Sequence, residues 1–109
     1  MAFKSKALEN IGQVGSPSQA LPTISNGTTA TVIGLSIANT SAAPIYGTAK
    51  LNKADGSKGS LIKDGVIVPG GTLIVVGGDQ KVVAEAGDTI TCYSSAANSA
   101  DIVCSYLLE

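Results

Sequence analysis

Apolar and polar residues alternate with a period of two along much of the chain after Thr29. Ile33, Leu35 and Ile37 fall on one side of the first such segment. Because successive side chains of a strand point to opposite faces, this alternation predicts half-buried β-strands. Clusters of Gly, Pro, Asn and Asp separate the segments and are typical of tight turns. The predicted strands span residues 29–38, 45–53, 60–68, 72–76, 81–85, 89–94 and 102–108, and the third is interrupted at Asp64-Gly65 by a β-bulge or a bend.

The spacing of these segments predicts the fold class. Seven or eight short strands follow one another at intervals of roughly ten residues, and no amphipathic helical pattern occurs between them. This is the pattern of an all-β domain, an antiparallel β-sandwich or jelly roll. The order of the strands within the sheets stays open.

Residues 1–28 lack a sustained period and hold two of the four prolines, so we expect an extended N-terminal arm followed by a β-sandwich domain at 29–109. A floppy terminus and a short edge strand near residues 7–14 are the alternatives. The arm is too apolar for a purely solvated tail, which favours a docked segment. Its expected subunit-contact residues are Phe3, Leu8, Ile11, Val14, Leu21 and Ile24.

Composition limits the core and the partners. A length of 109 residues fits a single domain, and with four aromatic residues the core must be built from Val, Ile, Leu and Ala. A net charge of −1 argues against nucleic acid and anionic membrane as partners. The apolar runs are far shorter than the roughly 20 residues of a membrane span, and the N-terminus lacks an apolar signal core, so we expect neither a span nor export by the usual route.

The chain contains no His and no Arg, the residues that most often supply acid–base catalysis and bidentate anion binding. Its aspartates at positions 55, 64, 79, 88 and 101 sit in or beside predicted turns, where Asp hydrogen-bonds its own backbone. Gly70-Gly71 and Gly77-Gly78 lack the helix and Lys of a phosphate cradle. We therefore expect no catalytic, metal or cofactor site, and no enzyme.

Cys92 and Cys104 flank a loop centred at Asn98. In a symmetric hairpin they would face each other within reach of a disulfide. Strand parity places both on a common face, which we expect to be the core. Without an export signal, two reduced thiols that fill space are favoured over a disulfide.

Residues 32–109 resemble small virion structural proteins of tailed bacteriophages. The motifs IGLSIANT, LIKDGVIVPGGTLIVVGGDQKVVAEAGD and SSAANSADIVCSYLLE occur in this order in such chains and in this one. The resemblance implies a component of a phage particle, located in the virion after assembly in the host cytoplasm, without fixing its station there.

The expected function is that of a capsid decoration or cement protein, a homo-oligomer with a trimer favoured, that contacts major capsid subunits. An apolar arm suits this function because it can add a strand to the sheet of a neighbour. A neck, tail or baseplate adaptor that anchors a fibre is the first alternative. A carbohydrate-binding module is the second, although so few aromatic residues provide little surface for sugar stacking.

Overall fold

The computed structural model describes residues 2–13, 15–77 and 79–109, which form nine β-strands. Short turns connect most of them, and none of the described residues is helical. The strands are β1 (Ala2–Leu8), β2 (Ser18–Leu21), β3 (Ala30–Asn39), β4 (Ile45–Asn52), β5 (Lys58–Ile67), β6 (Thr72–Val76), β7 (Val82–Ala84), β8 (Thr89–Ser94) and β9 (Ala100–Leu108). No helix among the described residues could span a membrane.

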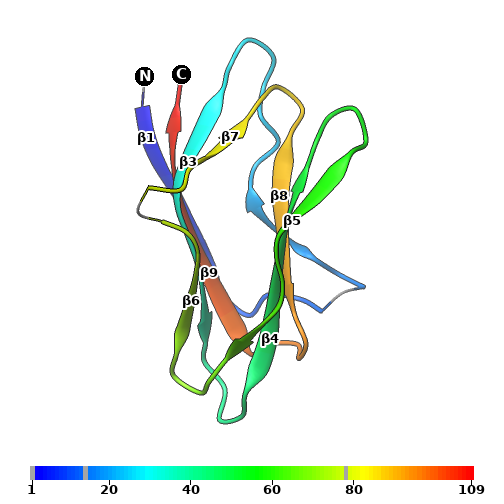
Figure 1. Ribbon diagram of the computed structural model, residues 1–109, viewed down its shortest axis with the longest axis vertical. Coiled ribbons are helices and arrows are strands. Elements are labelled where there is room, and N and C mark those ends of the chain that lie inside the picture. Colours follow the sequence, from blue (N-terminus) through cyan, green and yellow to red (C-terminus); the bar gives the residue numbers. More distant parts are fainter. Residues whose placement is uncertain (1, 14, 78) are drawn as a thin grey trace.

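The strands form two antiparallel sheets packed face to face, seen as two layers in Figure 1. Sheet A has the order β1-β9-β3-β6, and β7 pairs with β3 beyond the end of β6. Sheet B has the order β2-β8-β4-β5. The two chain termini lie together because Ala2 pairs with Leu108. The predicted all-β sandwich is confirmed.

The core lies between the two sheets, and the period-two alternation places residues in it. Buried and partly exposed positions alternate strictly along β8, where Ile90, Cys92 and Ser94 point inward. Among the described residues, Tyr106 is the one aromatic side chain of the core, which otherwise consists of aliphatic side chains and the two cysteines. At Gly47 an added Cβ would lie 3.2 Å from Ile37 Cδ1 of sheet A, so glycine leaves room for the opposite layer.

The predicted segments from β3 to β9 all appear as strands, with ends shifted by at most two residues. The prediction that Ile33 shares a face with Leu35 and Ile37 is wrong, because a register shift between Val32 and Gly34 turns Ile33 to the outer face while Leu35 and Ile37 lie in the core. The interruption at Asp64-Gly65 is a register irregularity of the β4–β5 pair, and Asp64 has φ of 52°. A residue in this left-handed conformation bends the strand locally, as a bulge does. The described chain has nine strands rather than seven or eight because the N-terminal segment adds β1 and β2.

The N-terminal segment does not extend away from the sandwich, as the expected arm at 1–28 would. β1 pairs with β9 over its whole length, and β2 pairs with β8. Between them, Ile11 N donates to Ala100 O and Ser94 N donates to Gly12 O, so this loop bridges the ends of both sheets. The boundary at 28/29 therefore does not divide two structural units in this chain.

The connection from β8 to β9 is not a hairpin. Cys92 pairs with Ser18 and Ala49 in sheet B, whereas Cys104 pairs with Lys6 and Leu35 in sheet A. The symmetric-hairpin geometry is wrong because both strands already have neighbours on both edges. Residues 95–99 instead cross from one layer to the other.

Candidate functional site

The outer face of sheet A carries no charge across most of its width. Its side chains are apolar, or small and neutral, over five strands. We define this face by Phe3, Ser5, Ala7, Thr31, Ile33, Gly34, Ser36, Ala38, Thr72, Ile74, Val83, Val103, Ser105 and Leu107. Asp101 at the start of β9 marks its border, where its Oδ1 accepts a hydrogen bond from Asn10 N at 3.0 Å.

Large apolar side chains on this outer face are exposed. Phe3 is 73% exposed, Ile74 64%, Val83 53% and Val103 47%. Since full burial of such a side chain contributes about 1.5–3 kcal/mol, covering these four would contribute several kcal/mol. An uncharged face of this kind is typical of a surface that packs against another protein.

The edge of sheet A is protected against pairing with another sheet. Lys4 lies opposite Tyr106 and Lys6 opposite Cys104, the inward-facing positions of β9. Lysines on the inward side of an edge strand disfavour the addition of a further strand, because their charges would be buried. Contacts of this sheet with a partner are therefore expected through its face rather than this edge.

The residues predicted for subunit contact do not lie together on one surface. Ile11, Leu21 and Ile24 are buried in the core, so their predicted role as contacts to another subunit does not fit the structure. Leu8 is half-buried against that core. Phe3 is openly exposed and belongs to the outer face of sheet A, and Val14 lies outside the described residues.

The outer face of sheet B differs in being polar. Gln19 Nε2 donates to Thr89 Oγ1 at 2.8 Å, and Asn52 Nδ2 donates to Thr91 Oγ1 at 3.0 Å. Two hollows open beside Tyr93, which lines both. One of about 350 Å³ is lined by Pro17, Lys50, Asn52, Lys58, Thr91 and Tyr93, and one of about 430 Å³ by Gln13, Gly15, Lys63, Asp64, Tyr93, Ser94 and Ser95.

A smaller apolar patch lies at one end of sheet B. Tyr46 and Val66 are cross-strand partners, and both are exposed, as is the neighbouring Val68. This patch holds fewer exposed apolar side chains than the outer face of sheet A.

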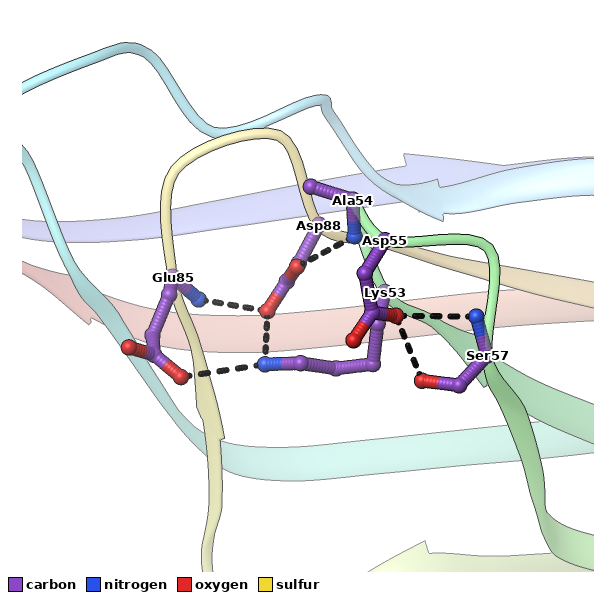
Figure 2. Close-up of polar contacts among 6 residues, drawn as sticks. All are labelled: Lys53, Ala54, Asp55, Ser57, Glu85 and Asp88. Atoms are coloured by element: carbon purple, nitrogen blue, oxygen red, sulfur yellow. Dashed lines mark hydrogen bonds and ion pairs between the residues drawn. The ribbon is translucent and has the colours of Figure 1, made fainter.

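Asp88 ties two turns together, as Figure 2 shows. Its carboxylate accepts hydrogen bonds from Ala54 N at 2.9 Å, from Glu85 N at 2.8 Å and from Lys53 Nζ. The ammonium of Lys53 and these amides hold the pKa of Asp88 below its ordinary value, and Lys53 also contacts Glu85 at 3.1 Å. With every oxygen so occupied, this buried carboxylate stabilises the fold rather than offering a base to a substrate.

The other aspartate beside these turns behaves as turn chemistry predicts. Asp55 Oδ1 accepts hydrogen bonds from Ser57 N and Ser57 Oγ, and these bonds lower its pKa. No group of three or more Cys, Asp or Glu within the described ranges is arranged to hold a metal ion.

Cys92 and Cys104 are both free and fully buried. Burial raises the pKa of Cys92 to about 12 and that of Cys104 to about 11. Since the thiolate is the reactive form, these thiols are unreactive at neutral pH. Both point into the core, as the parity of the sequence predicts, but from the inner faces of different sheets rather than from one common face.

Apart from Phe3, the residues of the two outer faces were not among the predicted site residues. Period-two parity could identify the outward positions of each strand, but grouping them requires the order of the strands, which comes from pairings such as β1 with β9 across the whole chain. The chain matches no protein-family model and no curated protein.

Proposed function

We propose that this chain is a non-enzymatic structural subunit of a bacteriophage particle, a capsid decoration or cement protein that packs the outer face of sheet A against a neighbouring subunit. The uncharged character of that face carries the proposal. The resemblance of residues 32–109 to small virion proteins supports the assignment to a phage particle.

The structure of the N-terminal segment changes how such a subunit would attach. Strands β1 and β2 are paired within the chain, so this segment is not available to complete the sheet of a neighbour. Attachment through a face instead requires a partner surface of complementary shape and apolar character. An assembly with many copies increases the total strength of such contacts. The major capsid protein is the proposed partner.

The number of copies per particle tests where in the particle the chain is located. Quantitative densitometry of purified virions should give on the order of hundreds of copies if the chain decorates the head, because the capsid lattice repeats its subunits many times. About six or twelve copies would instead place it in the neck, tail or baseplate, the alternative station. Absence from purified particles would overturn both.

Self-association is a separate part of the proposal. We expect a homo-oligomer with a trimer favoured, formed on the particle or in solution. Sedimentation of the purified chain measures this directly, and a chain that is monomeric both free and on the particle would contradict it.

A further inference from the structure

We propose that the outer face of sheet B binds an acidic oligosaccharide in the groove lined by Pro17, Lys50, Asn52, Lys58, Thr91 and Tyr93. This polar groove lies on the layer opposite the outer face of sheet A. The binding itself does not depend on the proposed structural function, since it concerns the isolated chain.

The two lysines of the polar groove favour an anionic ligand. Lys50 lies opposite Ser60 and Lys58 lies opposite Asn52, so the two lysines are diagonal neighbours across β4 and β5. Such neighbours are about 7–8 Å apart, close enough for both ammonium groups to reach one acidic ligand. Within the described part of the chain the ion pairs involve Lys53 and Lys63, and no acidic partner contacts Lys50 or Lys58.

The neutral groups of the polar groove suit sugar hydroxyls. Asn52 and Thr91 are among its lining residues and are hydrogen-bonded to each other, which fixes the amide and the hydroxyl in place. Tyr93 provides an aromatic surface for the apolar side of a sugar ring and a hydroxyl for its polar edge. Because Tyr93 also lines the second hollow with Gln13 and Lys63, the ligand can extend along the sheet past one ring.

An acidic peptide fits the polar groove less well. Peptides gain affinity on sheets chiefly by pairing their backbone with an exposed edge. Four of the six groove residues lie on β4 and β8, interior strands whose backbone groups pair on both sides, so this part of the face offers side chains alone. Lys58 lies on the edge strand β5, and a peptide paired with that edge would lie beside the groove rather than in it. Sugar hydroxyls and carboxylates use side-chain donors and need no free edge.

Calorimetric titration of the full chain with galacturonic-acid oligomers tests the proposal, with neutral galactose oligomers and polyglutamate as comparison ligands. We expect the acidic sugar to bind more tightly than either, with affinity that falls as salt is added. Lys50→Gln with Lys58→Gln should weaken binding about tenfold. Tyr93→Ala should weaken it by about tenfold through lost stacking.

The control is Lys81→Gln, which removes one exposed lysine away from this face. It should bind the acidic sugar as the native chain does. Three results would overturn the proposal: no binding of the acidic oligomer, equal affinity in the groove variants and the control, or equal affinity for polyglutamate. The last would identify a site for acidic peptides. None of these results bears on particle occupancy, so the proposed structural function stands or fails separately.

Discussion

Asn39 joins three backbone segments at the end of β3. Its side chain is 2% exposed, and Nδ2 donates to Ala43 O at 2.9 Å and to Ile67 O at 3.0 Å while Oδ1 accepts from Ser41 N and Ser41 Oγ. It therefore fixes the turn between the layers to the end of β5. A buried amide with this many partners is costly to replace.

Replacing Asn39 by Ala or by Asp should destabilise the fold by about 1–3 kcal/mol, because buried acceptors lose their donors. Asp has nearly the same shape but no N–H groups, so it separates hydrogen bonding from packing. Urea unfolding measures the change, with Asn26→Ala at an exposed position as the control. Unfolding midpoints that coincide for all variants would show that these hydrogen bonds contribute little.

The environment of Asp88 should make the stability of the fold depend on pH. Its folded pKa is lowered from 3.8 by Lys53 and the two amides, so the folded state favours the charged carboxylate. The stability this contributes is fully present above about pH 4 and is lost as pH falls through the lowered folded value. Asp88→Asn should thus lower stability at neutral pH and flatten its decline in acid.

Thermal unfolding of the native chain, Asp88→Asn and the exposed control Asp79→Asn across acidic pH checks this expectation. The control should keep the native profile. A native acid limb in Asp88→Asn would mean that other carboxylates control the acid sensitivity.

At the scale of elements, the N-terminal strands complete both sheets. Ile11, Leu21 and Ile24 fill the core, and β2 covers the edge of β8. Deleting residues 1–28 should abolish the cooperative fold, since several buried apolar side chains are lost at about 1.5–3 kcal/mol each. Circular dichroism and thermal unfolding measure it. A truncated chain that still unfolds cooperatively would show that residues 29–109 form a domain by themselves.

The inward-facing lysines of the edge strand β1 should prevent this strand from pairing with another chain. Replacing Lys4 and Lys6 by Thr removes the inward charges, which should allow edge pairing and concentration-dependent self-association. Sedimentation at several concentrations detects this, and Lys81→Thr, which removes one exposed lysine outside β1, is the control. If the double variant sediments like the control, these lysines do not protect the edge.

Strand identity and strand order differ in how far the sequence predicts them. Alternation predicts β3, β8 and β9 because each has one face in the core, and turn residues mark their ends. Pairing is non-local, so the same pattern misplaced Cys92 and Cys104 on a single hairpin. The sequence predicted an arm in place of β1 and β2, because prolines and short apolar runs are typical of an extended arm. The strands that pair with β1 and β2 are β9 and β8, which lie near the C-terminus, so no local pattern reveals the pairing.

At the scale of the whole molecule, the sandwich presents two unlike faces. The outer face of sheet A is uncharged over most of its width, and that of sheet B is polar and carries the lysines of the groove. If the first packs on a particle, the second points away from it, toward solvent and further ligands. This difference between the two faces would not be expected of a sandwich that is solvated equally on both sides.

The most direct test of the packing role places charge on the outer face of sheet A. Ser36→Lys with Ser105→Lys adds two lysines to neighbouring strands of that face, and Ser25→Lys with Ser60→Lys adds two at exposed positions elsewhere. The measurement is the number of subunits retained per purified particle, with thermal unfolding to confirm that each variant folds. The account predicts that the first pair loses most of its occupancy and the second keeps it. Normal occupancy of a folded Ser36→Lys, Ser105→Lys chain would contradict it.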